Sequence, residues 1–112
     1  MDEKYVNQLP DGTKINTSNK VNKTRIIDGI EISEIQLTHK NGVSVLLATA
    51  TNISGEDKDT TVIEITLYDD KNNVLEIIEG IISPIKPGES VQLNMGISAD
   101  YANAYNFSVK GK

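Results

Sequence analysis

The feature that most constrains this chain is an Asn-Gly pair, Asn41-Gly42, that separates two apolar runs. Both residue types accept the positive φ angles of a two-residue type I′ turn, so the pair predicts a tight β-hairpin. Before the pair, residues 26–37 alternate between apolar and polar, which predicts a strand with one buried face. After it, residues 43–52 are apolar in both phases, which predicts a central strand covered on both faces over part of its length.

The alternation of the first run slips by one residue at Ser33-Glu34. Ile32 before the slip and Ile35 after it lie in opposite phases of the pattern. A regular strand would turn the second half to the wrong face, because side chains alternate with a period of two. We therefore expect a β-bulge at this dipeptide, which absorbs the extra residue.

Further short apolar segments follow, separated by turn-forming residues. Strands are expected at residues 61–69, 74–78, 80–83, 91–97 and 106–110, with one short helical turn at 99–104. No segment shows a sustained helical period, so a helical bundle or a parallel α/β fold is not expected. About seven or eight strands at this turn spacing predict an all-β, immunoglobulin-like or fibronectin type III-like antiparallel β-sandwich.

The chain divides by composition into two parts. Residues 1–24 are polar and contain a strong turn signal at 9–12, so we expect an extended lead-in or stalk. Residues 25–112 are expected to form the sandwich domain, with its core beginning at Arg25. A chain of 112 residues suits one domain, and the absence of cysteine excludes disulfides and thiolate metal sites.

Charge and hydropathy limit the partners. The chain has 11 basic and 16 acidic residues, a net charge of -5, so it repels phosphate backbones and we expect no nucleic-acid partner. No stretch approaches the roughly 20 apolar residues that cross a bilayer. A link to a membrane would need an anchor absent from this sequence, so the protein is either cytosolic or a product from which an export segment was removed. The sequence specifies no oligomeric state.

Three segments resemble a known family. Residues 47–52 (LATATN), 65–69 (ITLYD) and 85–90 (IKPGES) are similar to the bacterial FxLYD-type immunoglobulin-like domains, over a match that spans residues 30–109. Ile65 stands where the family has phenylalanine, and Asn72-Asn73 replaces a turn that usually contains glycine. Both replacements keep the physical requirement, because isoleucine fills an inward site and asparagine tolerates a left-handed backbone.

The resemblance implies a setting. The family occurs mostly in exported, membrane-tethered or lipid-anchored proteins of Gram-positive bacteria, with no enzymatic role assigned. It implies a non-catalytic, extracellular or envelope-associated module whose partner is another envelope protein, bound by an edge strand or by end loops. Two alternatives remain: a purely structural spacer, or a module that binds calcium or a saccharide through its end loops.

The sequence contains no motif that indicates a catalytic site. His39 is the only histidine, and its place before the Asn-Gly turn predicts an exposed side chain. A nucleophile elbow of the Gly-x-Ser-x-Gly kind is absent, and a histidine metal site would need a second ligand of its type. We expect no enzymatic activity, and we assign no catalytic, cofactor-binding or metal-binding residues.

Acidic loops are the better candidates for a ligand site. Glu56, Asp57 and Asp59 share one loop, and Asp69 and Asp70 share another. Calcium binds clustered oxygen ligands, but it needs six or more that converge, and EF-hand spacing is absent. Solvated loops at the ends of a sandwich are the alternative interpretation.

The aromatic residues have both structural and functional interpretations. We expect the ring of Tyr68 to cover a sheet edge while its hydroxyl bonds to the backbone, and Asp69 to accept backbone N–H groups that start a turn. Tyr101, Tyr105 and Phe107 cluster near the C-terminus. They could form a partner surface, or Phe107 could be core while the tyrosines close one end of the sandwich.

Overall fold

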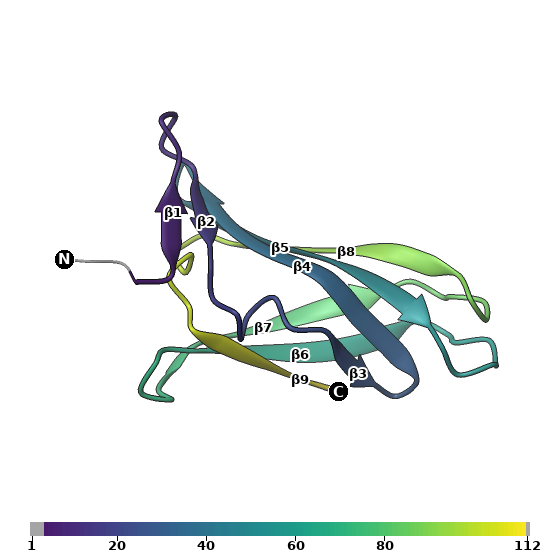
Figure 1. The fold of residues 1–112 in the computed structure, drawn as a ribbon. Helices are drawn as coiled ribbons and strands as arrows, with labels where there is room; N and C mark the ends of the chain where they lie inside the picture. The colour runs from purple at the N-terminus through teal and green to yellow at the C-terminus, as the bar shows by residue number, and fades with distance from the viewer. Residues whose placement is uncertain (1–3, 112) are drawn as a thin grey trace.

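Two antiparallel sheets lie face to face in the computed structural model, which describes residues 4–111 (Figure 1). The larger sheet contains β1 (Val6–Gln8), β2 (Lys14–Asn16), β3 (Arg25–Ile27), β4 (Ile30–Lys40), β5 (Val43–Asn52) and β8 (Ser90–Ile97). The smaller sheet contains β6 (Thr61–Tyr68), β7 (Val74–Ile82) and β9 (Asn106–Gly111). The described residues form nine strands and no helix, so the predicted all-β sandwich is confirmed.

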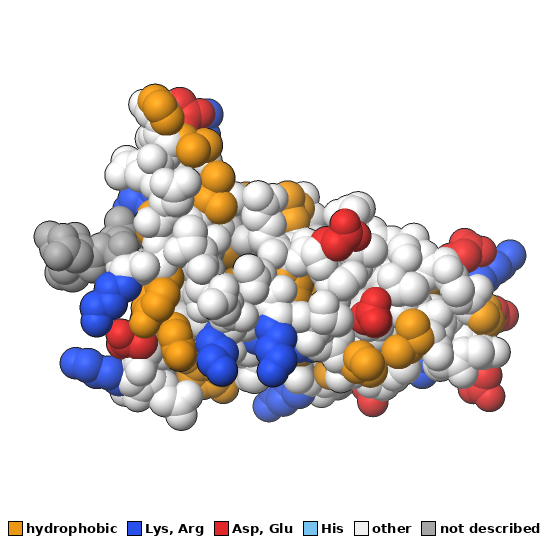
Figure 2. Space-filling view, in the orientation of Figure 1, with side chains coloured by type: hydrophobic (Ala, Val, Ile, Leu, Met, Phe, Trp, Pro, Cys, Tyr) orange, Lys and Arg blue, Asp and Glu red, His pale blue; other side chains and the backbone are white. Residues whose placement is uncertain are grey.

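Strand order explains which edges are open. The larger sheet runs β1-β2-β4-β5-β8. β3 pairs with the same edge of β4 as β2 does, but β3 pairs with the beginning of β4 and β2 with its end. The smaller sheet runs β7-β6-β9, so β6 is central and β7 and β9 are its edges. In Figure 1 the short β1–β2 hairpin rises above the body, and Figure 2 shows its tip standing clear of the sandwich.

The predicted turn and bulge are both present between β4 and β5. Asn41 and Gly42 have φ angles of 53° and 80°, as a type I′ turn requires, and Lys40 pairs with Val43. The pairing shifts between Ser33 and Gln36, and Glu34 has a φ of 52°. The bulge keeps the isoleucines on either side of it on the buried face.

The core lies between the sheets and is dominated by β-branched and leucine side chains. Its largest fully buried members are Ile30, Ile32, Leu37, Leu46, Ile63, Ile65, Leu67, Ile82 and Val21. Along β5, the inward face is buried and the other face is only half-buried, so the expected cover on both faces is partial. Every buried side-chain polar atom of the described residues has a hydrogen-bond partner, as stability requires.

The N-terminal residues are part of this fold, so the predicted core boundary at Arg25 is wrong. Residues 17–24, which we call the crossover, connect β2 to β3 and pass beside the start of β9. Val21 in the crossover is 1% exposed and belongs to the core, and the buried Ser18 donates its hydroxyl to the carbonyl of Tyr105. The sequence pattern missed these contacts because β1 and β2 are only three residues long.

Arg25 fastens the crossover to the smaller sheet. Its guanidinium lies 3.6 Å from the centre of the Phe107 ring and donates to the Phe107 carbonyl at 2.9 Å. It also donates to the carbonyls of Lys20, Val21 and Lys23 in the crossover. Burial lowers the pKa of this guanidinium. Arg25 therefore joins the crossover to β9.

Two smaller predictions need correction. Residues 74–78 and 80–83 were expected to be separate strands, but β7 is continuous through Gly80. A Cβ at Gly80 would lie 2.5 Å from the Met95 sulfur, so a larger residue here would force the Met95 side chain to shift where β7 and β8 approach each other. Where a helical turn was expected at residues 99–104, the chain forms a reverse turn at residues 101–104, in which the Ala104 N–H donates to the Tyr101 carbonyl.

The buried crossover generates a prediction. Val21→Ala should lower the free energy of unfolding by about 2 kcal/mol, because it removes buried methyl groups and leaves a cavity. Asn22→Ala is the matched control, since its side chain is exposed. Urea denaturation followed by circular dichroism measures both variants. Equal stability of the two variants would show that the crossover is not packed against the core.

Candidate functional site

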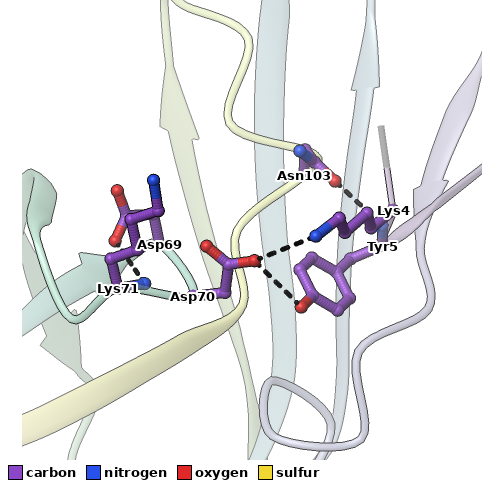
Figure 3. Close-up of a pocket in the computed structure, with 6 residues that line it drawn as sticks. All are labelled: Lys4, Tyr5, Asp69, Asp70, Lys71 and Asn103. Carbon is purple, nitrogen blue, oxygen red and sulfur yellow. Dashed lines mark hydrogen bonds and ion pairs between the residues drawn. The ribbon is translucent and has the colours of Figure 1, made fainter. Parts of the chain in front are cut away.

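A small polar pocket lies where three segments far apart in the sequence meet (Figure 3). It has a volume of about 260 Å³. Its lining residues are Lys4, Tyr5, Asp69, Asp70, Lys71 and Asn103. They come from the start of the chain, from the β6–β7 turn and from the loop before β9, so the pocket exists only in the folded chain.

The β6–β7 turn holds Asp69 in place. Its Oδ1 accepts the N–H groups of Lys71 at 2.9 Å and Asn73 at 2.8 Å, as the sequence predicted. Asn72 has a φ of 66°, the left-handed conformation that asparagine tolerates. The hydrogen bond from the Asn73 backbone is the main cause that lowers the pKa of Asp69. This carboxylate is therefore occupied by the turn.

Asp70 projects toward the N-terminal segment. Its Oδ2 lies 3.4 Å from the Tyr5 hydroxyl and 3.7 Å from the Lys4 ammonium, as Figure 3 shows. The Tyr5 N–H donates to Asn103 Oδ1 at 2.9 Å, and its ring packs against Tyr105 with centroids 4.9 Å apart. Burial, followed by the Asp70 charge, raises the pKa of Tyr5. The polar groups of the pocket thus already bond to one another.

The other aromatic residues have structural surroundings. Phe107 is buried in the core, as one of the two interpretations predicted. The Tyr101 hydroxyl donates to Glu76 at 3.3 Å, so Tyr101 does not join the pocket. The Tyr68 hydroxyl lies 3.0 Å from Ser108 Oγ, a side-chain partner where a backbone partner was expected.

His39 is not the exposed turn residue that was predicted. It lies next to the last residue of β4 and is half-buried, with Nδ1 3.9 Å from Asp100 Oδ2, because the loop before β9 folds over this end of the strand. Lys14 contacts the same oxygen at 2.6 Å. Burial raises the pKa of Asp100, but hydrogen bonds from Lys14 and the Ala102 N–H and the charge of His39 together lower it.

The acidic loop between β5 and β6 does not gather its carboxylates around one point. Glu56 contributes its backbone carbonyl, which accepts a hydrogen bond from the buried Asn52 amide. Within residues 4–111, no group of three or more acidic, histidine or cysteine side chains could hold a metal ion. The geometry therefore gives no support to a calcium site at either end loop.

An apolar edge strand is the second candidate surface. In the described structure, β7 pairs with β6 alone, so its other side is open. We call the residues Val74, Ile77, Glu79 and Ile81 the β7 edge. All four are exposed, and the three apolar side chains are 57%, 54% and 66% exposed. An edge strand with large exposed apolar side chains is a template for pairing with another chain.

The outer face of β6 continues this surface. Val62 lies opposite Ile81 and Thr66 lies opposite Ile77 in the β6–β7 ladder. Glu64 lies opposite Glu79 and pairs with Lys110 at 3.2 Å. The surface is thus apolar at both ends and acidic at its centre. Sequence reasoning missed it because nothing local tells which strand becomes an edge, although isoleucines in the outward phase of residues 74–82 were a signal.

Comparisons with known proteins define only the fold. No family model matches this chain, and no curated protein matches it. A crystal structure of a DUF1425 family member from Shewanella sp. pv-4 shares the fold at a TM-score of 0.51 and 11% identity, over 96% of this chain and 94% of that one. The bacterial neighbour is compatible with a bacterial immunoglobulin-like domain, and it does not confirm the FxLYD resemblance. The described residues contain no helix long and apolar enough to span a membrane.

The Asp69 turn predicts a pH dependence. Because the pKa of Asp69 in the folded protein is below the ordinary 3.8, its contribution to stability is present above 3.8 and is lost as pH falls through the lowered value. In Asp69→Asn, the free energy of unfolding should therefore fall less on acidification than in wild type. Urea denaturation at neutral and acidic pH measures this.

Asp57→Asn is the control, because residue 57 lies in the loop between β5 and β6, at the other end of the sandwich (Figure 1). Its free energy of unfolding should fall on acidification as much as that of wild type. If Asp69→Asn loses as much stability as wild type on acidification, the carboxylate does not fix the turn.

Proposed function

We propose that this chain is a non-catalytic, immunoglobulin-like module of a membrane-tethered or secreted bacterial protein. In this proposal it binds another envelope protein through the β7 edge. The carrying observation is the set of exposed apolar side chains on a strand with an open edge, because leaving them in water costs free energy unless a partner covers them. Main-chain pairing to an open edge would supply affinity, and alternate side chains would supply specificity.

The pocket beside Tyr5 is a weaker candidate than the edge. Its carboxylates, amide and phenol already bond to each other or to the turn, so a saccharide would have to displace those bonds. The Tyr5 ring already packs against the Tyr105 ring. Over most of the β7 edge, a partner would not have to displace existing hydrogen bonds. We therefore assign binding to this edge.

The envelope setting is supported by the sequence resemblance to FxLYD-type domains. Protease treatment of intact source cells tests it, with an antibody against this polypeptide and a cytosolic protein as the control. Loss of the polypeptide with the control intact is expected. Survival in intact cells and degradation after lysis would place the domain inside and overturn the setting.

Binding through the edge has its own test. A photo-crosslinking amino acid at position 81 should capture a protein in source cells, and that protein, once purified, should bind the isolated chain. The double substitution Ile77→Ser and Ile81→Ser should weaken this binding at least about tenfold, because two apolar anchors are lost.

Ile26→Ser with Ile53→Ser is the matched control, since these side chains are 64% and 50% exposed but lie on the larger sheet and the loop after it. Equal weakening by both pairs would show that exposed apolar area in general, and not the β7 edge, drives binding. If position 81 captures nothing and neither pair changes any interaction, the spacer alternative holds.

A further inference from the structure

We propose that two copies of this chain associate through β8, the last strand of the larger sheet. In this dimer the open edge of β8 pairs antiparallel with the same edge of the second copy, so the larger sheet continues from one copy into the other. The contact goes beyond the proposed function, because it uses a strand of the other sheet and does not depend on binding at the β7 edge.

The main chain of β8 has an open side. Among residues 4–111, β8 pairs with β5 alone, and this ladder runs from Ser90 to Ile97 without a register shift. Main-chain groups point alternately to the two sides of a strand, so every second residue of β8 directs its N–H and C=O away from β5. β7 of the smaller sheet meets β8 at the buried Met95 side chain, so it packs against the inner face of β8.

β8 lacks the features by which strand edges oppose pairing with an identical copy. Such features are charged side chains, prolines, bulges, short strands and covering segments. β7 contains Glu76 and Glu79, β9 contains Lys110 and has the crossover beside it, and β1 and β3 are three residues long. β8 has eight residues and contains no charged residue, no proline and no bulge. It is therefore a regular, uncharged edge.

The side chains of β8 are complementary to those of an identical strand. The exposed residues alternate with residues that pack in or against the core; the first set is Ser90, Gln92, Asn94 and Gly96, and the second is Val91, Leu93, Met95 and Ile97. When Leu93 lies opposite Leu93 of the second copy, Gln92 lies opposite Asn94 and Val91 lies opposite Met95, and each pair occurs twice. Apolar side chains then meet apolar ones, and amides meet amides.

Amide side chains suit a contact between identical copies because each one both donates and accepts hydrogen bonds. A carboxylate or an ammonium group cannot satisfy its own kind in this way. Gln92 donates to Thr49 Oγ1 at 3.4 Å, which uses one of its two N–H groups. Gln92 and Asn94 are both exposed, so they can bond across the two-fold axis without leaving the core.

Charge limits the surfaces through which two copies can meet. Each copy has a net charge of -5, so acidic surfaces of two copies repel each other. Pairing through β8 places no charged residue between Ser90 and Ile97 in the contact. Glu89 precedes the strand, and the antiparallel direction puts the two Glu89 residues at opposite ends of the paired segment. Because the contact uses the open edge of both strands, it closes at two copies.

Sedimentation velocity of the full chain over a series of concentrations tests this dimer. We expect a reversible equilibrium between monomer and dimer in wild type. Asn94→Lys should raise the dissociation constant at least about tenfold, because it brings two like charges to the contact and places lysine on the paired edge. Gln36→Lys is the matched control and should leave the equilibrium unchanged.

The control changes the net charge equally and lies on the same face of the same sheet. Gln36 is exposed and pairs with Leu47 of β5, which pairs on its other side with Asn94, so one row across the sheet contains both substituted positions. Gln36 lies on β4, away from the β8 edge. Equal weakening by both lysines would overturn the contact through the edge, because net charge alone would explain it.

Disulfide formation gives a second measurement, since the natural chain has no cysteine. An equimolar mixture of Gln92→Cys and Asn94→Cys should form a mixed disulfide under mild oxidation, and should do so faster than Gln36→Cys links to itself. Mass spectrometry without reductant identifies the linked pair. A mixed disulfide that forms no faster than the Gln36→Cys dimer would contradict the contact.

The remaining outcomes separate this dimer from the β7 edge. A wild-type chain that stays monomeric at every concentration would overturn the dimer and leave the proposed function standing. A dimer that is lost in the double variant Ile77→Ser and Ile81→Ser but kept in Asn94→Lys would assign the contact to β7 and overturn pairing through β8. Capture of a partner at position 81 tests the proposed function independently of all these results.

Discussion

Burial of the inner face of β6 is the constraint on which the rest of this structure depends. Ile63, Ile65 and Leu67 have no exposed surface, and they can reach that state only when the larger sheet covers them. β6 pairs on both sides, with β7 and β9, so the central strand has no free edge. Once the two sheets stack, the strands at the edges of each sheet remain to be covered or left open.

The two sides of the sandwich differ in how their edge strands are covered. On the side of β4 and β9, the crossover packs Val21 into the core, and Arg25 ties it to Phe107. On the side of β7 and β8, Gly80 allows the strands to come close to the other sheet, and the structure describes no segment paired with the open edge of β7. The first side is covered by the chain's own residues, and the second is where we propose the binding surface.

The candidate site was less predictable than the fold. Asp69 was identified correctly as a turn-forming residue, because an aspartate that bonds to backbone groups two and four residues ahead is a local device. The approach of Tyr5 to Asp70 joins residues 65 positions apart, and no local pattern predicts it. His39 was misplaced for the same reason, since Asp100 and its loop come from the far end of the chain.

The sequence by itself determined the strand pattern, the Asn41-Gly42 turn and the bulge near Glu34, because each depends on side-chain alternation or on backbone angles of neighbouring residues. The tertiary structure alone decided that residues before Arg25 belong to the core and that β7 is an open edge. Both facts depend on which strands pair across long separations. Short strands such as β1 and β2 carry too little pattern to fix their pairing until the two sheets close around the β6 core.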